Sequence, residues 1–273
     1  MITYKRRQYL LEVLQERPDL GVLEMARALK VSQGTIRNDL NALQAEGRVK
    51  RVHGGAILLD KNIATNNSFH SRYDQNVSAK IAIAHQAAQL VSDGDSVLFD
   101  ASSTAYYVAC AISHKNELRV VTNGFHTANE LAKNNSNKVA LIGGMVNFNA
   151  SSVTGLLSER VIEDLYVQKA FLSCSGFSLE RGMTELHLNE AQLKRKVIHI
   201  ADQLIALIDA SKIGKEDLTP FARPEDIYRL FTDEKITEQW EQKLLDAGID
   251  LVICDEQDIP NYDQHHLKTK RYI

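Results

Sequence analysis

The stretch 31–47 constrains the fold of this chain more than any other, because its residues have the pattern of one complete short helix. Ser32 suits the N-cap, since its side-chain oxygen can accept a hydrogen bond from an unpaired amide of the first turn. Gly47 suits the helix end, where only glycine adopts a left-handed conformation without penalty. Three apolar residues share one stripe at helical spacing: Ile36, Leu40 and Leu43. The sequence therefore predicts a helix with one buried and one exposed face.

The exposed face of this helix carries a guanidinium, amides and hydroxyls but no carboxylate. Such groups contact base edges and phosphates in the major groove of DNA. An ordinary surface helix is the alternative that the stretch alone leaves open. Six side chains are the candidates for DNA contact: Ser32, Gln33, Thr35, Arg37, Asn38 and Asn41.

The neighbouring segments favour DNA binding over an ordinary helix. Residues 22–29 repeat apolar residues at helical spacing, and the short turn that follows completes a helix-turn-helix pattern. A preceding helix is expected over 6–16, and the basic stretch 48–57 is typical of a two-stranded wing. Residues 1–59 are therefore predicted to form a winged helix-turn-helix domain that binds double-stranded DNA. Three basic residues of the wing are further candidates for DNA contact: Lys50, Arg51 and His53.

Several of these residues together resemble the N-terminal module of the DeoR family of bacterial sugar-responsive transcription regulators. The resemblance rests on Thr35-Ile36-Arg37, Asp39-Leu40, Leu43, Glu46-Gly47 and the run from Arg51 to Ala56. It implies a sequence-specific regulator with a winged helix-turn-helix head. Most members have a second basic residue where this chain has Asn38, so no operator sequence carries over.

Charge is unevenly distributed along the 273 residues, although the net formal charge is only −3. Residues 1–59 hold ten Lys and Arg against six Asp and Glu, whereas the remainder holds 22 against 29. A basic head on an acidic body fits nucleic-acid binding confined to the head. The three cysteines match no metal-ligand or redox spacing, and no apolar run is long enough for a membrane span. We therefore expect a cytoplasmic protein without metal, cofactor or membrane partner.

The sequence changes character after the head. A polar stretch predicts a linker and lead-in at 60–77. Helical patterns then alternate with short, continuous apolar runs, which imply strands buried on both faces and hence a mostly parallel sheet. The fold class is therefore α/β, with a Rossmann-like effector-sensing domain over 78–256 and a tail over 257–273. The predicted strands are 96–100, 119–122, 138–142, 169–173, 204–209, 229–232 and 251–253.

Groups suited to ligand binding follow several of these strands at their carboxyl ends, where ligands gather in open α/β sheets. The hydroxyls and amides of 100–104 form a candidate anion cradle at a helix start, and a simple N-cap is an equal alternative. The turns 122–124 and 143–144 either bring backbone close to a ligand or are merely tight turns. The predicted effector-binding residues are Asp100, Ser102, Ser103, Thr104, Thr122, Asn123, Gly124, Gly143, Gly144, Glu190, Lys194 and Lys212.

Three of these residues have plain structural alternatives. Glu190 and Lys194 are spaced i, i+4 in the order that stabilises exposed helices, so they fit a surface ion pair as well as a binding site. Lys212 follows a buried strand, where it either meets a phosphate or remains a solvated lysine. The sequence alone leaves both choices open.

The same residues are similar to the effector domain of the DeoR family, so the resemblance covers nearly the whole chain. That domain is related in fold to ribose-5-phosphate isomerase, glucosamine-6-phosphate deaminase and the CoA transferases, and its usual ligand is a phosphorylated sugar. The resemblance assigns phosphate or hydroxyl contacts to Asp100, Ser102, Ser103, Thr104, Asn123 and Lys212. Many members have Asp-Gly where this chain has Ser175-Gly176. The closer similarity is to the fucose-repressor branch, which implies a deoxy-sugar phosphate.

These patterns predict a transcription regulator, in this family most often a repressor of a carbohydrate catabolic operon, released from DNA by a phosphorylated sugar. A transcription activator is one alternative, and an isomerase-like enzyme is another. An enzyme needs a poised acid or base, for which Asp100, Glu185 and His187 are the candidates. None of them sits in a motif connected with turnover, so no catalytic residue is assigned. Two-fold operators need paired heads, so we expect a homo-oligomer, either a dimer or a tetramer.

Overall fold

The computed structural model describes residues 3–16, 20–45, 48–52, 54–58, 68–255 and 257. The chain forms two compact units, residues 1–66 and 67–273. The second unit thus begins before residue 78, and it already holds a helix, α4, at Phe69–Asp74 within the expected lead-in. Residues 60–67 of the predicted linker lie outside the described residues, as does the predicted tail apart from Gln257.

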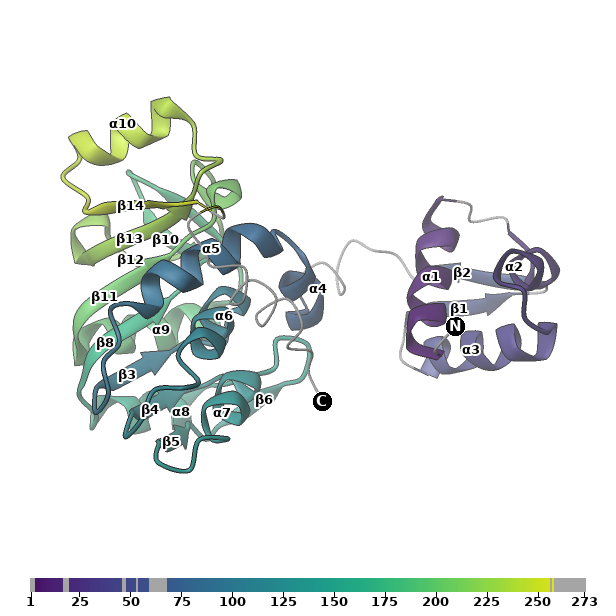
Figure 1. The fold of residues 1–273 in the computed structure, drawn as a ribbon, viewed down its shortest axis with the longest axis horizontal. Helices are drawn as coiled ribbons and strands as arrows, with labels where there is room; N and C mark the ends of the chain where they lie inside the picture. The colour runs from purple at the N-terminus through teal and green to yellow at the C-terminus, as the bar shows by residue number, and fades with distance from the viewer. Residues whose placement is uncertain are drawn as a thin grey trace. The chain divides into compact units, whose positions relative to one another are not determined.

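The described residues of the first unit form three helices and a β-hairpin (Figure 1). Its elements are α1 Thr3–Glu16, α2 Val22–Leu29, α3 Gln33–Ala45, β1 Val49–Val52 and β2 Gly55–Leu58. Apolar residues of all three helices share one core with Val49 of the hairpin. The two strands pair antiparallel, with Val49 opposite Leu58. The predicted winged helix-turn-helix fold is confirmed.

Helix α3 begins where the sequence predicts. The backbone amide of Thr35 donates to Ser32 Oγ at 3.1 Å, so Ser32 supplies an acceptor to the first turn. Lys30 ends α2 in a left-handed conformation, with φ at 52°. The predicted apolar stripe of α3 is buried. The predicted stop at Gly47 lies outside the described residues.

An ion-pair cluster that the sequence analysis missed ties α3 to α1. Asp39 is only 2% exposed. Arg6 Nε donates to its Oδ2 at 2.5 Å, and Arg7 Nε donates to its Oδ1 at 3.2 Å. Because hydrogen bonds between guanidinium and carboxylate groups are strong and directional, this cluster fixes how α3 presents its exposed face.

Seven parallel strands form the main sheet of the second unit, in the order β14-β13-β11-β8-β3-β4-β5. In chain order they are β3 Ser96–Phe99, β4 Arg119–Thr122, β5 Lys138–Leu141, β8 Val167–Leu172, β11 Ala201–Leu207, β13 Ile227–Asp233 and β14 Leu251–Cys254. Each overlaps a run that the sequence predicts as a strand, although β8, β11 and β13 begin two or three residues earlier than predicted. The predicted α/β fold class is confirmed. Because the strands are parallel, their carboxyl ends lie along one edge of the sheet.

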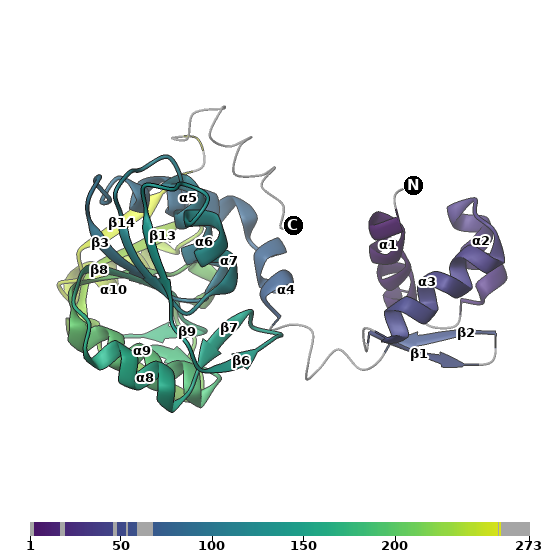
Figure 2. The same ribbon diagram turned by 90° about the horizontal axis from the view of Figure 1, so that it is seen from below.

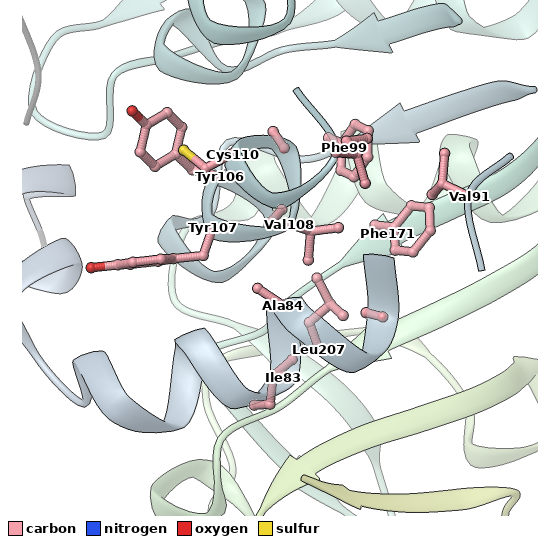
Figure 3. Packing of buried hydrophobic residues seen from close by; sticks show 14 of the residues in the cluster. Ile83, Ala84, Val91, Phe99, Tyr106, Tyr107, Val108, Cys110, Phe171 and Leu207 are labelled. Carbon is pink, nitrogen blue, oxygen red and sulfur yellow. The ribbon is translucent and has the colours of Figure 1, made fainter. Parts of the chain in front are cut away.

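Helices cover both faces of this sheet (Figure 2). They are α5 Val77–Ala88, α6 Ser103–Ala111, α7 Phe125–Leu131, α8 Leu156–Glu163, α9 Leu188–Ile200 and α10 Glu238–Asp246. On the face covered by α5 and α6, the rings of Phe99 and Phe171 stack at 4.9 Å (Figure 3). Leu98 belongs to the other cluster, which includes residues of α9. Successive residues of one strand thus serve two cores, as in sheets buried on both sides.

Short elements that the sequence analysis did not predict follow the carboxyl ends of several strands. β6 Met145–Asn147 and β7 Ser152–Thr154 form a hairpin. β9 Gly176–Ser178, β10 Gly182–Glu185 and β12 Thr219–Ala222 form a small antiparallel sheet, and 3-10 turns lie at Ala210–Lys212 and Pro224–Asp226. Helix α8 begins at Leu156, because the preceding Val153 and Thr154 pair with β6 and Gly155 turns the chain at φ 98°.

Replacement of Asp39 tests the ion-pair cluster of the first unit. Asp39→Ala is expected to destabilise this unit by about 3 kcal/mol, because it leaves two guanidinium groups without their buried partner. Hydrogen exchange of α1 and α3 amides in the full chain measures the loss, and the exposed Arg27→Ala on α2 is the control. Unchanged protection in Asp39→Ala would mean that the cluster does not hold the helices together.

Candidate functional site

The predicted DNA-contacting face of α3 is largely exposed. Gln33, Arg37, Asn38 and Asn41 are exposed, as is Ser32 at the helix start. Thr35 is half-buried, and its hydroxyl lies 2.9 Å from Ser32 Oγ. The Arg37 guanidinium and the amides of Gln33, Asn38 and Asn41 therefore form a polar surface with no carboxylate, since Asp39 is turned inward against α1.

The wing residue Arg51 is engaged within the first unit. Its guanidinium donates to Asn41 Oδ1 at 2.7 Å and to the backbone oxygens of Gly55 at 3.3 Å and Arg37 at 3.4 Å. Its backbone amide donates to Gln44 Oε1 at 2.8 Å. Arg51 thus fastens the wing to α3. Of the other wing candidates, Lys50 is exposed and His53 lies outside the described residues.

In the second unit, Asp100 lies at the centre of a buried polar network at the carboxyl edge of the sheet. It follows β3 and is 3% exposed. Its two oxygens accept from the backbone amides of Ser102 at 3.1 Å and Ser173 at 3.0 Å. Lys194 Nζ from α9 lies 2.9 Å from Asp100 Oδ2. Asp100 thereby joins the ends of β3 and β8 to α9.

Lys194 reaches further polar groups from the same position. Its Nζ donates to Glu185 Oε1 at 2.5 Å and to the backbone oxygen of Ser173 at 2.8 Å, and it lies 5.1 Å from the Phe221 ring centroid. Lys194 is 5% exposed and Glu190 8%. The alternative of an exposed i, i+4 pair is therefore wrong, because both side chains are covered by the loops of the sheet edge.

Burial and charge pairing set the ionisation of this network. Burial favours a neutral Asp100, but the Lys194 ammonium and the hydrogen bonds hold the pKa of Asp100 below its usual value. Burial also opposes the charge on Lys194, yet Asp100 and Glu185 raise the pKa of Lys194. For Glu190 burial prevails, so its pKa is raised. Asp100 and Lys194 therefore form a charged pair, and Glu190 takes up a proton more easily than an ordinary glutamate.

Glu190 connects α9 to β7 and to the end of β4. Ser152 Oγ donates to Glu190 Oε1 at 2.6 Å, and Asn123 Nδ2 lies 3.4 Å from Glu190 Oε2. Asn123 Nδ2 also donates to the backbone oxygen of Val153 at 3.2 Å. These contacts bring two predicted effector residues together at the base of the β6–β7 hairpin.

The glycine turns after β4 and β5 are close-packed. Thr122 Oγ1 accepts from the Gly124 amide at 3.1 Å, and a Cβ at Gly124 would lie 3.0 Å from Ala101 Cα. A Cβ at Gly144 would lie 2.3 Å from Ser158 Oγ, whose hydroxyl donates to the Gly143 oxygen at 2.8 Å. These approaches are between parts of the protein, so Gly124 and Gly144 are explained by packing without a ligand.

The predicted anion cradle at the start of α6 is closed to solvent. Ser102, Ser103 and Thr104 are 7%, 3% and 0% exposed. Ser102 Oγ accepts from the Ala105 amide at 3.1 Å, as an N-cap does. Thr104 Oγ1 is buried without a hydrogen-bond partner, which is unfavourable for a hydroxyl. A ligand reaches these groups only if the surrounding loops move.

Lys212 is the more accessible cation of the network. It follows β11, and its side chain is 24% exposed. Its Nζ donates to Ser173 Oγ at 3.1 Å and lies 3.5 Å from Asp209 Oδ2. Despite burial, Lys212 and the surrounding hydrogen bonds hold the pKa of Asp209 below its usual value. Lys212 is therefore more open to a ligand than Lys194, which is 5% exposed.

A pocket of about 440 Å³ opens beside this network. One side is the β6–β7 hairpin, where Met145 is 73% and Phe148 is 88% exposed, and the other is the start of α9. Glu190 belongs to its wall. Sequence reasoning missed the hairpin side, because two three-residue strands give too short an alternation to recognise. The full lining is Met145, Val146, Asn147, Phe148, Asn149, Thr154, His187, Leu188, Asn189 and Glu190.

The described part of the chain offers no metal site. Within it, no three His, Cys, Asp or Glu side chains are grouped closely enough to hold an ion. The cysteines are buried and form no disulfide, and burial raises the pKa of Cys174 to about 12. The described helices also include none long and apolar enough to cross a membrane.

Two family models match this chain. One, described as the DeoR-like helix-turn-helix domain, matches residues 6–62, and the other, described as the DeoR C terminal sensor domain, matches residues 75–234. The chain belongs to the DeoR family. This DeoR-family protein is 36% identical over 255 residues to the HTH-type transcriptional regulator GolR of Listeria innocua, covering 93% of this chain and all of GolR. This chain is a DNA-binding transcription regulator, as predicted.

Two further comparisons concern the expected similarity to the fucose-repressor branch and the expected fold of the sensor domain. The L-fucose operon activator of Haemophilus influenzae is 29% identical over 254 residues, covering 93% of this chain and 97% of that protein. Ribose 5-phosphate isomerase A of Methanocaldococcus jannaschii shares 16% identity at a TM-score of 0.35, over 49% of this chain and 53% of that one. A structural likeness of this size bears on neither the activity nor the ligand of the DeoR-family regulator.

Removal of the Lys194 ammonium tests the buried network. Lys194→Met is expected to destabilise the second unit by about 3–5 kcal/mol, because buried Asp100 and half-buried Glu185 lose their shared cation. In this variant burial, no longer offset by the ammonium, should raise the pKa of Asp100 above its unfolded value, so stability should recover as pH falls toward 5. Urea unfolding followed by circular dichroism measures both effects. Lys196→Met, on the same helix, breaks only the surface pair with Glu163 and should cost much less; equal losses in the two variants would contradict the assignment.

Proposed function

We propose that this DeoR-family regulator represses a carbohydrate catabolic operon and leaves its operator when a phosphorylated sugar binds at the carboxyl edge of the sheet. The observation that carries the proposal is the pairing of two sites in one chain. An exposed, carboxylate-free helix face lies in the first unit, and a pocket beside a charged network lies in the second. A ligand controls DNA binding only if it binds the two conformations of the protein with different affinity.

On the DNA side, Arg37, Asn38 and Gln33 are the side chains best placed to read bases. They are exposed on α3, and their guanidinium and amide groups suit guanine and adenine edges. Lys50 and the excess of basic residues in 1–59 supply phosphate contacts. The Arg51 guanidinium is hydrogen-bonded to the Asn41 side chain, so these two residues act chiefly by holding the wing against α3. Paired heads on a two-fold operator require at least a dimer.

On the effector side, the pocket and Lys212 supply different contacts. Glu190, Asn189 and His187 line the pocket with groups that bind sugar hydroxyls. Lys212 can hold phosphate in exchange for Ser173 Oγ. The hydroxyls of Ser102, Ser103 and Thr104 join the site only if the closed loop opens, and the unpartnered Thr104 Oγ1 favours such an opening. The similarity to an L-fucose operon regulator supports a deoxy-sugar phosphate.

Enzymatic turnover is not part of this proposal. Lys194 holds the pKa of Asp100 below its usual value, so Asp100 is not poised to shuttle protons near neutral pH, and Glu185 is hydrogen-bonded to the same ammonium. His187 stands before α9 and lines the pocket. Turnover of pentose or hexose phosphates by the purified chain would contradict this view.

The direction of control separates repression from activation. The relative in Haemophilus influenzae is named an activator, whereas repression is the commoner mode implied by the family resemblance. Deletion of the gene should raise transcripts of the neighbouring operon if the protein represses, and lower them if it activates.

Arg37→Ala tests the reading of bases. Loss of a base-contacting guanidinium should weaken binding to the operator by about 1–3 kcal/mol while leaving affinity for random duplex less affected. Fluorescence anisotropy with the full chain and duplex from its own upstream region measures both affinities. Arg181→Ala, in the second unit, is the charge-matched control. Equal operator affinity for Arg37→Ala and the parent chain would refute the assignment.

Lys212→Ala tests the phosphate contact. A panel of ribose 5-phosphate, fructose 6-phosphate and fuculose 1-phosphate is screened by thermal stabilisation of the full chain, where saturation at 100 times Kd adds about 2.7 kcal/mol. Lys212→Ala should reduce this stabilisation for the phosphorylated sugar that binds, because a charge-assisted hydrogen bond is lost. Lys215→Ala, exposed three residues later, should leave it unchanged. A binding sugar phosphate that stabilises Lys212→Ala equally would exclude Lys212 from the site.

A further inference from the structure

Helix α4 is the first described element of the second unit, and it follows the chain that leads from the DNA-binding unit. Ser68 Oγ caps it by accepting from the Ser71 amide at 3.1 Å. The amide of its first residue, Phe69, donates outside the helix to the backbone oxygen of Asn149 at 2.8 Å. Asn149 lies in the loop of the β6–β7 hairpin and lines the pocket. One residue thus belongs to the pocket wall and also anchors the start of α4.

Further contacts join α4 to the same hairpin loop. The ring of Phe69 stacks on His126 at 4.3 Å between centroids, and His126 Nε2 lies 3.2 Å from Ser151 Oγ. The Phe125 amide donates to the Ser151 oxygen at 3.0 Å. Burial lowers the pKa of His126 to about 4, so near neutral pH the stack on Phe69 involves an uncharged ring. The start of α4 is therefore packed against the hairpin as well as hydrogen-bonded to it.

The end of α4 is tied to the other part of the candidate site. Buried Lys80 of α5 donates through Nζ to the backbone oxygens of Arg72 and Gln75. Asn76 Nδ2, just beyond the helix, lies 2.9 Å from Asp209 Oδ1 and 3.0 Å from Ser211 Oγ. Asp209 in turn faces Lys212. The two ends of a six-residue helix are thus held by the two loops that the proposed effector would contact.

We infer that α4 couples the effector site to the DNA-binding unit, because its two anchors are the hairpin loop and the Asp209–Lys212 turn. The inference rests on the proposed function. Six residues do not form a stable helix by themselves, so the position and order of α4 depend on these anchors and on the packing of Phe69 and Tyr73 against Tyr106 and Tyr107 of α6. A ligand that shifts residues 147–149 moves the acceptor of the Phe69 amide, and the change passes along the chain toward the head. Coupling of this kind is reciprocal, so loosening α4 must also loosen the hairpin.

Reciprocity allows a test without any ligand. Phe69→Leu keeps an apolar side chain but loses the stack on His126. Hydrogen exchange of the full chain should then quicken about tenfold in the hairpin, residues 145–154, because a local anchor is lost. Phe231→Leu is the matched control, since both rings are 2% exposed and belong to the same core cluster. Hairpin exchange that is unchanged in Phe69→Leu, or equally faster in both variants, would overturn the inference.

A second measurement tests whether α4 transmits the effect of ligand binding to DNA affinity. Anisotropy with the upstream duplex gives the ratio of DNA affinities without and with fuculose 1-phosphate, ribose 5-phosphate or fructose 6-phosphate. This ratio should fall toward one in Phe69→Leu and remain at the parent value in Phe231→Leu. An undiminished ratio in Phe69→Leu would contradict coupling through α4. Failure of the parent chain to bind DNA or any of the three probes would count against the proposed function, while the exchange result would still decide whether α4 and the hairpin are coupled.

Discussion

The buried contact between Lys194 and Asp100 is the interaction on which the sensor unit depends. Their charges are separated from solvent, and each is compensated by the other and by fixed backbone groups. Because Asp100 follows β3, Ser173 follows β8 and Lys194 lies on α9, a single ammonium–carboxylate pair fixes the relative positions of two strand ends and the helix beside the pocket. An isolated buried charge would be very costly, so the network keeps one geometry.

Around this rigid centre lie parts that are less constrained. Lys212 has longer contacts and more exposure than Lys194, Thr104 Oγ1 lacks a partner, and the hairpin exposes Met145 and Phe148. A metabolite sensor needs this contrast, because a ligand can only shift an equilibrium between states that differ in their contacts with it. Helix α4 joins the less constrained parts to the chain that leads to the head. Charged side chains also fix the geometry of the first unit, where Asp39 holds α3 against α1 and Arg51 holds the wing against α3.

The fold was largely predictable, because its signals are local. Apolar runs such as 96–100 predict strands buried on both faces, and Ser32 indicates the start of a helix. The site was only partly predictable. Asp100, Asn123, Glu190 and Lys194 do meet at one edge, but the sequence could not tell that Lys194 pairs with Asp100 and Glu185 rather than with solvent. Contacts between residues far apart in the chain, such as Asp39 with Arg6 or Phe69 with Asn149, leave no periodic signal and were missed.

The most direct test of the account is the affinity of the full chain for duplex from its own upstream region, measured against random duplex as sugar phosphates are added. The account predicts a preference of at least about 10³ for the upstream duplex. It also predicts that a phosphorylated sugar removes this preference, whereas its unphosphorylated form does not. Equal affinity for both duplexes, or a preference that no phosphorylated sugar alters, would contradict control of DNA binding by a phosphorylated sugar.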